Sequence, residues 1–267
     1  MRHVALVLLA AVACAHGGDA PASGTRVVSL TPSATEVVAA LGATSTLVGV
    51  DDFSKYPPEV EKLPKVGSFM QPNVEVIVRL HPTLVIVDDI HATTARALSD
   101  TGIATVACPM HDLANVRECL RVVGAKLGKT READVARAAI DAAITSARAH
   151  SLPRQRVLAV IDRSAGDLGN AIAAGPGSWV GELLDAVGVD NAIAETRYAK
   201  VSLETMLRAQ PDVILDLSGQ DLAAWSAIDV PAVRNHRVFA VDEKTLQGPG
   251  PRVQVALDAL YRSLSSR

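Results

Sequence analysis

Two long polar loops carry aromatic side chains that could hold a flat ligand. Tyr56 and Phe69 lie within residues 51–72, and Tyr198 lies within residues 191–201. Tyrosine and phenylalanine supply broad contact area at a small cost in conformational entropy. A loop this long in a compact unit is usually functional. We therefore expect these three aromatics to contact a bound small molecule.

Charged side chains follow other predicted strands, where they either cap the loops or face a ligand. Asp88 follows the apolar run at 84–87, and Asp242 follows the run at 238–241. Arg252 ends a third loop, whose sequence closes with GPGPR, and its charge would suit an anionic ligand. In open α/β sheets, ligands bind beyond the carboxyl ends of the strands. These three residues are therefore further candidates for ligand binding.

The familiar motifs of catalysis are absent from the sequence. It contains no GxxxxGK phosphate loop, no GxGxxG after a predicted strand and no GxSxG nucleophile elbow. The seven histidines are scattered, with no pair at helical spacing and no adjacent cysteine, so we expect no dedicated metal site. No nucleophile, base and orienting group fall into a recognisable spacing. We expect a binding protein, with an exported α/β enzyme as the alternative of another class.

The sequence segments that would position these residues occur twice in the chain, as an internal repeat. Glutamate, arginine and proline recur at one spacing before a strand-like run, at Glu75, Arg79 and Pro82 and again at Glu204, Arg208 and Pro211. A second match, in the same order, pairs residues 36–42 with residues 182–188. Strands alternating with helices predict a mainly parallel sheet in each copy. The repeat predicts two α/β lobes.

One long helix is predicted between the two copies, over residues 130–150. Thr130 offers a side-chain oxygen for the N-cap, and apolar residues recur at three- and four-residue steps. We predict two Rossmann-like α/β lobes, at 25–124 and 154–267, joined by a linker region at 125–153 that holds this single helix. Lobes that face each other would place Tyr56, Phe69, Tyr198 and Asp242 around one cleft.

The two glutamates of the repeat have two interpretations. Glu75 and Glu204 each lie four residues before an arginine on a predicted helix, where an internal ion pair would contribute only a few tenths of a kcal/mol. Alternatively, two acids held apart by a rigid linker would suit docking at two points onto a membrane partner.

The start of the chain is typical of an exported protein. Residues 4–13 form an apolar run that is too short to span a bilayer and suits a secretory signal, followed by a flexible tether to residue 24. Cys14 follows small residues, so it is either acylated as a lipoprotein cysteine or close to an ordinary cleavage site. We expect a periplasmic protein, which is lipid-anchored through Cys14 in the first of these two cases. The net charge of −3 and the lack of a basic run argue against nucleic acid as a partner.

Export also bears on the other two cysteines. Cys108 and Cys119 are the remaining pair, and the periplasm is oxidising. A disulfide that closes so short a loop would stabilise the fold by roughly 3 kcal/mol. The alternative is two buried thiols, one at a strand end and one on the apolar face of a helix.

Several segments together resemble the periplasmic solute-binding proteins of cobalamin and ferric-chelate ABC importers. The resemblance covers nearly the whole mature chain and rests on RVVSLTPSATEVVAALGA, LVGVDDFSKYPPEV, LPKVGSFMQPNVEVIVRLHPTLVIV, GPGSWVGELLDAVGVDNAIAE and VSLETMLRAQPDVILD. It implies two α/β lobes bridged by one long helix, a monomer without an intrinsic cofactor, and an inner-membrane ABC permease with its ATPase as partner.

The resemblance also implies roles for single residues. Tyr56, Phe69 and Tyr198 fall where aromatic residues line the cleft of the family's cobalamin binders, whereas Asp88 replaces a further cleft tryptophan. An acid that precedes the final Pro-Arg in the family is displaced here, with Asp242 upstream of Arg252. The resemblance further implies that two glutamates dock into arginine pockets of the permease, and the matching residues are Glu75 and Glu204.

The expected ligand is cobalamin or another corrinoid, whose cobalt is already ligated internally. Haem is the first alternative and would favour an axial tyrosine or histidine, for which the candidates are Tyr56, Tyr198 and His91. An anionic ferric siderophore is the second alternative and would favour cationic residues, for which the candidates are Lys55, Arg197, Lys200 and Arg252.

Overall fold

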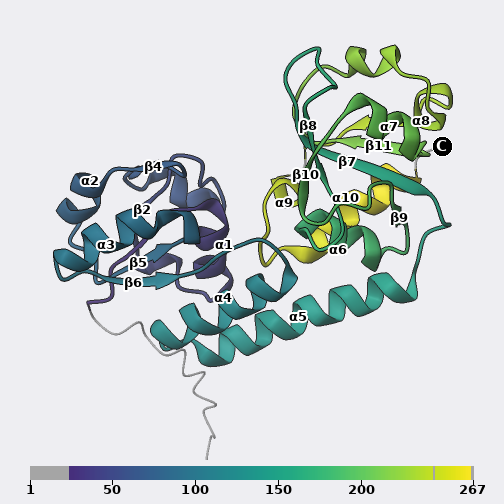
Figure 1. Cartoon of the computed structure of the whole chain (residues 1–267). Coiled ribbons are helices and arrows are strands. Elements are labelled where there is room, and N and C mark those ends of the chain that lie inside the picture. Colours follow the sequence, from purple (N-terminus) through teal and green to yellow (C-terminus); the bar gives the residue numbers. More distant parts are fainter. Residues whose placement is uncertain (1–23, 243, 266–267) are drawn as a thin grey trace, which may run out of the picture.

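A computed structural model describes residues 24–242 and 244–265. Two α/β lobes lie side by side along one long helix, α5 (Thr130–Ala149), as Figure 1 shows. The predicted signal peptide and Cys14 lie outside the described residues. Within those ranges, no helix combines the length and the hydropathy that crossing a bilayer requires.

The N-terminal lobe is built on a four-stranded parallel sheet, as the alternation of strands and helices predicts. The strands are short Val- and Ile-rich runs that are almost wholly buried in the centre of the sheet, which is typical of parallel sheets covered on both faces. Their order is β2-β1-β5-β6, with bounds β1 (Val27–Ser29), β2 (Leu47–Val50), β5 (Leu84–Val87) and β6 (Ala104–Ala107). The lobe also contains a small hairpin and three α-helices, β3 (Gly67–Ser68), β4 (Gln71–Pro72), α1 (Pro32–Ala40), α2 (Val74–Arg79) and α3 (Ala92–Asp100).

The C-terminal lobe has a mixed sheet of six strands. The strands are β7 (Arg156–Asp162), β8 (Ala171–Ala174), β9 (Asp190–Asn191), β10 (Tyr198–Val201), β11 (Val213–Asp216) and β12 (Val238–Ala240). They run in the order β10-β8-β7-β11-β12, with β9 paired to β7. Its helices are α6 (Trp179–Ala186), α7 (Leu203–Ala209), α8 (Pro231–Arg234), α9 (Lys244–Gln247) and α10 (Val253–Ser265).

One edge of this second sheet departs from the expected parallel arrangement. Strand β8 is antiparallel to β7, and β10 is antiparallel to β8. Strand β10 lies in residues 191–201, which the sequence predicts to be a loop, and β8 is the alanine-rich run Ala171–Ala174. Alanine has low β-propensity, and these short strands are stabilised by pairing with their neighbours rather than by their own side chains.

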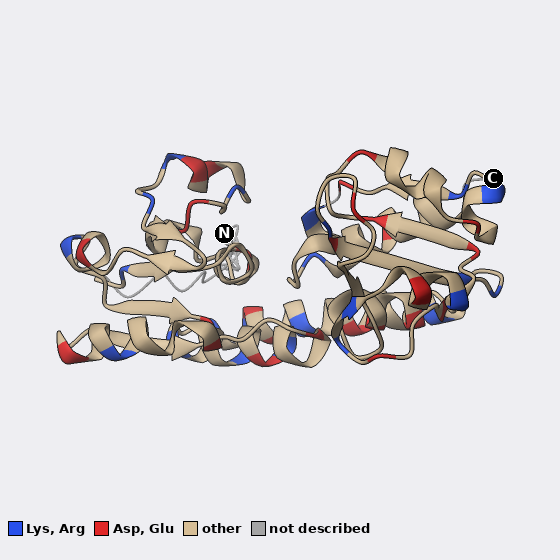
Figure 2. Cartoon of the chain, turned by 45° about the horizontal axis from the view of Figure 1, so that its top comes forward, with Lys and Arg blue, Asp and Glu red and all other residues tan. Residues whose placement is uncertain are grey.

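Helix α5 joins the lobes and packs against both of them. Its buried stripe is Ala133, Ile140, Ala143, Ile144 and Ala147. The helix begins at Thr130 and its N-cap is Lys129, without a side-chain cap bond, so the expectation that Thr130 is the N-cap residue is wrong. Helix α4 (Leu113–Lys126) precedes it and runs back along it, and charged residues of both signs alternate on the outer side (Figure 2). Apolar residues of both lobes and of α5 form one continuous core.

The structure pairs Cys108 and Cys119 as a disulfide. Their Cα atoms lie 5.2 Å apart, and both residues are buried. Cys108 follows the end of β6 and Cys119 lies on α4, so the bond ties the segment between them to the helix that it leads into.

Loss of this disulfide should destabilise the protein. We expect the variant C108A/C119A, like the reduced wild type, to lose roughly 3 kcal/mol of unfolding free energy, because a short closed loop restricts the unfolded chain. Urea unfolding with and without a reductant measures this loss, and the double variant should not respond to the reductant. Identical midpoints for the oxidised and reduced wild type would contradict the prediction.

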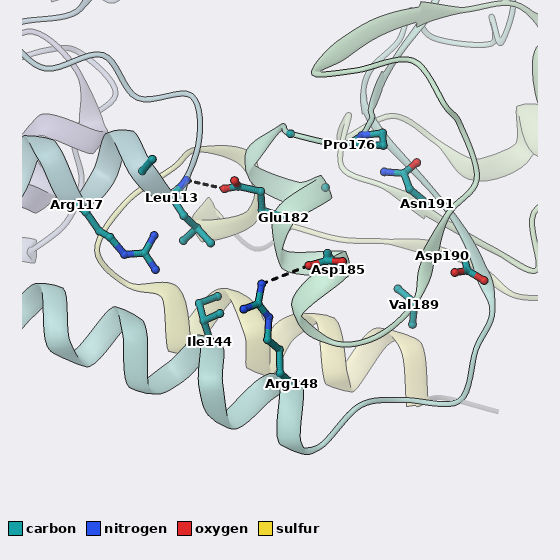
Figure 3. A pocket seen from close by; sticks show the side chains of 13 residues that line it. Leu113, Arg117, Ile144, Arg148, Pro176, Glu182, Asp185, Val189, Asp190 and Asn191 are labelled. Atoms are coloured by element: carbon teal, nitrogen blue, oxygen red, sulfur yellow. Dashed lines mark hydrogen bonds and ion pairs between the residues drawn. The ribbon is translucent and has the colours of Figure 1, made fainter.

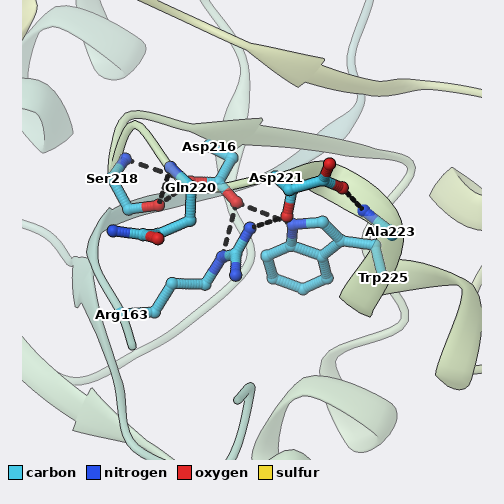
Figure 4. A network of polar contacts seen from close by, with 7 residues as sticks. All are labelled: Arg163, Asp216, Ser218, Gln220, Asp221, Ala223 and Trp225. Atoms are coloured by element: carbon cyan, nitrogen blue, oxygen red, sulfur yellow. Dashed lines mark hydrogen bonds and ion pairs between the residues drawn. The ribbon is translucent and has the colours of Figure 1, made fainter. Parts of the chain in front are cut away.

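A buried ion pair lies at the carboxyl end of the second sheet (Figure 4). Arg163 Nε donates to Asp216 Oδ2 at 2.7 Å, and the two side chains are 0% and 1% exposed. Trp225 Nε1 donates to the same oxygen at 2.7 Å, and Arg163 Nη2 donates to the carbonyl of Asp221 at 2.6 Å. The other Asp216 oxygen accepts from the backbone N–H of Ser218. These bonds hold together the loops that follow β7 and β11.

Candidate ligand-binding site

A cavity of about 570 Å³ opens where the two lobes meet. The N-terminal lobe contributes the start of α1 and the loop after β2, and the C-terminal lobe contributes α9 and the turn into α10. Its lining residues are Pro32, Ser33, Glu36, Phe53, Lys55, Tyr56, Lys244, Gln247, Gly248, Pro249 and Arg252.

Three side chains organise the wall of this cavity. The guanidinium carbon of Arg252 lies 4.0 Å from the ring centroid of Tyr56, a cation–π arrangement. Arg252 also donates to both oxygens of Glu36, from Nε at 2.9 Å and from Nη2 at 2.5 Å. Glu36 lies on α1, whose start is fixed by Thr31, because the Thr31 hydroxyl accepts from Ala34 N at 3.0 Å. The Arg252–Glu36 pair thus joins the two lobes and presents the Tyr56 ring.

The chemistry of the cavity combines exposed aromatic surface with positive charge. Phe53 and Tyr56 remain substantially exposed although both are large apolar side chains. Lys55 and Lys244 add two ammonium groups, of which Lys244 pairs with Asp242 at 2.6 Å. Such a wall can hold a broad, partly apolar ligand with polar or anionic substituents.

Four of the six predicted ligand residues do not line this cavity. Tyr56 and Arg252 lie in it, whereas Asp242 contacts it only through its ion pair with Lys244. Phe69 packs edge-on against His91, with ring centroids 5.4 Å apart. The remaining two, Asp88 and Tyr198, are described below.

His91 has both ring nitrogens in hydrogen bonds to the backbone. Nδ1 accepts from Asp88 N at 3.0 Å, and Nε2 lies 2.7 Å from the Phe69 carbonyl. The residue is buried. This arrangement fixes the turn after β5 and leaves no ring nitrogen to ligate haem iron.

Tyr198 begins β10, at the edge of the second sheet, and is half-exposed. Burial of part of the ring raises the pKa of its phenol above the usual value. The neighbouring Arg197 Nη2 lies 3.9 Å from Asp112 Oδ2 of the segment before α4. This edge of the second lobe therefore approaches the other half of the protein at Asp112 rather than at Tyr56.

Asp88 belongs to a cluster with Asp89 and His111. Asp88 is buried directly after β5, and Asp89 Oδ2 lies 2.9 Å from His111 Nε2. Burial raises the pKa of Asp88 to about 6, with a further contribution from the adjacent Asp89 carboxyl group. Hydrogen bonds with Asp88 and then His111 lower the pKa of Asp89 to about 2. The cluster therefore places two carboxyl groups beside one imidazole ring.

A second cavity, of about 550 Å³, lies between α4, α5 and α6 (Figure 3). At its edge Glu182 Oε2 accepts from the backbone N–H of Leu113 at 2.7 Å, and Arg148 Nη2 lies 3.5 Å from Asp185 Oδ2. Its lining contains no aromatic residue, and it faces the linker helices. The cavity beside Tyr56 is therefore the better candidate for holding a flat ligand.

The two candidate docking glutamates are exposed but differ in their contacts. Glu204, on α7, forms an ion pair with Arg208 Nη2 at 2.5 Å, with the side chains 80% and 73% exposed. Glu75, in the first turn of α2, has no ion pair with Arg79 among the described residues. The internal pair that the sequence suggested for both copies is thus present in only one.

Phe53 and Glu36 are among the residues of the cavity wall that the sequence did not single out as ligand contacts. Phe53 is in the predicted loop, and its aromatic type was the available signal. Glu36 was recognised only as part of the internal repeat, because its partner Arg252 is 216 residues away. No local pattern reveals a contact at that separation.

Comparison with known proteins connects this geometry to transport. A family model described as "Periplasmic binding protein" matches residues 27–245. The uncharacterized ABC transporter substrate-binding lipoprotein YvrC of Bacillus subtilis is 28% identical, over 90% of this chain and 79% of the relative. A vitamin B12-binding protein of Vibrio cholerae is 27% identical, over 89% of this chain and 88% of the relative.

Solved structures share the fold over almost their whole length. The apo form of the periplasmic heme-binding protein RhuT from Roseiflexus sp. RS-1 superposes with a TM-score of 0.77 and 30% identity, covering 90% of this chain and 98% of that one. The periplasmic vitamin B12-binding protein BtuF of Vibrio cholerae superposes with a TM-score of 0.71 and 25% identity, covering 90% and 95%.

Proposed function

The chain belongs to the periplasmic binding protein family, and on that premise we propose that it captures a corrinoid such as cobalamin and delivers it to the permease of an ABC importer. Proteins of this family are the substrate-binding components of such transporters and not enzymes, so the alternative of an exported enzyme is set aside. The family implies a membrane permease and its ATPase as partners.

The observation that carries the proposal is the cavity between the lobes with Tyr56 and Phe53 on its wall. A corrin is a broad, partly apolar disc, and its cobalt needs no ligand from the protein. Stacking and apolar contact are then the main requirements, and exposed aromatic rings meet them. Relatives named as vitamin B12-binding proteins, including the one from Vibrio cholerae, support this choice.

Haem is the second candidate, favoured by the similarity to RhuT and by the Tyr56 phenol on the cavity wall. Tyr56 would serve as the axial ligand, since His91 has no ring nitrogen available. Lys55 and Lys244 would pair with the carboxylates of haem. A ferric siderophore has less support, because Arg252 is already paired with Glu36 and neither Arg197 nor Lys200 lines the cavity.

The colour of the bound ligand tests the proposal directly. The purified protein is incubated separately with cyanocobalamin, with hemin and with a ferric siderophore, and each sample is then desalted. We expect the visible spectrum of cyanocobalamin to remain with the protein at one equivalent. Retention of hemin alone would favour the second candidate, and retention of none of the three would contradict capture of a metal chelate in this cavity.

Truncating Tyr56 should weaken ligand binding. We expect Tyr56→Ala to lose roughly 1–3 kcal/mol of binding free energy, or about 5- to 150-fold in affinity, because an aromatic contact in the centre of a site is removed. Calorimetry with cyanocobalamin measures the change. Tyr198→Ala is the matched comparison, since Tyr198 does not line the cavity and its removal should leave the affinity near that of the wild type. Wild-type affinity in Tyr56→Ala would contradict the proposed site.

We also propose that the chain is exported and that Cys14 carries a lipid. The name of the Bacillus subtilis relative, a lipoprotein, supports this proposal. Mass spectrometry of the mature protein from membranes tests it. A diacylglyceryl group on Cys14 is expected, and a mature chain that begins after residue 14 would contradict it.

A further inference from the structure

We propose that Asp88, Asp89 and His111 form a binding site for one divalent transition-metal cation, of the kind that nitrogen and oxygen ligands prefer. The site lies at the carboxyl ends of the neighbouring strands β5 and β6 and shares no residue with the cavity beside Tyr56. It does not depend on the identity of the transported ligand.

The three side chains already bring their ligand atoms together. One oxygen of each carboxylate and one imidazole nitrogen lie within 4.8 Å of one another, and His111 Nε2 is 2.9 Å from Asp89 Oδ2. Zinc binds such atoms at about 2.0–2.2 Å, which sets neighbouring ligand atoms roughly 3.0–3.5 Å apart. A single ion can therefore contact all three groups after small side-chain adjustments.

A second observation points to a missing positive partner. Asp88 is 5% exposed, and its Oδ1 has no hydrogen-bond partner among the described residues. A buried carboxylate oxygen without a donor is costly, and most buried polar atoms in proteins are satisfied. A cation bound between Asp88, Asp89 and His111 would supply that interaction.

The cluster is both preformed and accessible. Cys108, three residues before His111, is bonded to Cys119 on α4, and the Asp112 side chain accepts from Asn115 N at 2.8 Å at the start of that helix. These two ties hold the segment that carries His111. The Asp89 and His111 side chains are 56% and 35% exposed, which leaves a path for the ion and an open position for water.

The donor set indicates the class of ion. One imidazole and two carboxylates suit zinc, manganese or iron(II) better than calcium or magnesium, which prefer oxygen ligands alone. The competing interpretation is an ordinary exposed ion pair between Asp89 and His111 beside a buried carboxyl group. Metal binding distinguishes the two, because an ion pair alone would not retain a cation.

The test is a calorimetric titration of the chelator-treated full chain with ZnCl₂. We expect Asp88→Asn and His111→Gln each to weaken the binding of one zinc ion at least tenfold, and the double variant to lose it. Addition of CoCl₂ to the wild type should produce visible absorption bands that the double variant lacks. Thermal melts show whether each variant is folded. If Asp88→Asn fails to fold, the test rests on His111→Gln, which changes a partly exposed side chain.

The matched control is D141N/H150Q, which removes one exposed aspartate and one exposed histidine of the linker region and should bind zinc as the wild type does. Donors within residues 1–23 remain in every variant, so a difference between variants assigns the ion to the cluster. Equal zinc affinity in the wild type and D88N/H111Q, or no bound zinc in the wild type, would overturn the proposal. No corrinoid is present in this experiment, so its outcome is independent of the proposed function.

Discussion

Replacing Asp216 with alanine is expected to lower the free energy of unfolding by about 3–5 kcal/mol. The change leaves the Arg163 guanidinium buried without its carboxylate, and an uncompensated charge in the interior is strongly destabilising. It also removes the acceptor of the Trp225 indole N–H and the contact that orders Ser218. The loops after β7 and β11 should therefore loosen together.

Urea unfolding followed by circular dichroism measures this effect. The control is Glu118→Ala, which removes one partner of the exposed Glu118–Arg121 pair and should cost less than about 1 kcal/mol. The double variant R163M/D216L replaces the pair with apolar side chains and should recover much of the loss, since no charge stays buried. An Asp216→Ala midpoint equal to that of Glu118→Ala would contradict the prediction.

The second large effect is expected on transport. The variant E75A/E204A should keep the folding and ligand affinity of the wild type and lose delivery to the importer. Both glutamates are exposed, on the corresponding helices α2 and α7 of the two lobes. Exposed charges of this kind steer association and fix orientation on a partner. Docking should also weaken with salt, because the Debye length falls to about 3 Å at 1 M.

Uptake into vesicles that carry the cognate importer measures delivery. Arg208→Ala is the informative control, because it removes the internal partner of Glu204 and keeps the carboxylate. That variant should deliver ligand as the wild type does, and its stability should change by only a few tenths of a kcal/mol. Uptake at the wild-type rate by E75A/E204A would rule out docking through these residues, and a large loss of its thermal stability would indicate an internal role.

The repeat in the sequence predicted the two-lobed architecture because its matching segments lead into central parallel strands, β5 and β11. Strand β5 is wholly apolar and β11 is apolar up to its last residue, Asp216, so their burial is visible in the residue types. Strands β8 and β10 were missed because alanine and exposed polar residues carry no such pattern. They exist through pairing with β7 and with each other, which is a tertiary effect.

The candidate site was predictable only in part for a similar reason. Tyr56 and Arg252 stood out by residue type and by position in their loops, and both line the cavity. Glu36, which pairs with Arg252, comes from the opposite end of the chain. Asp89 and His111 are 22 residues apart and meet only because β5 and β6 are neighbours in the sheet. Convergence of this kind follows from topology rather than from spacing.

The Arg252–Glu36 pair also bears on how a ligand could leave the cavity. Their two hydrogen bonds cross from one lobe to the other at the wall of the cavity, and Glu182 makes a comparable bond to Leu113 at the matching position of the repeat. Separation of the lobes at the cavity requires both Arg252 bonds to break at once. Where separation of the lobes precedes ligand release, substitutions at this pair are expected to raise the dissociation rate more than they change the association rate.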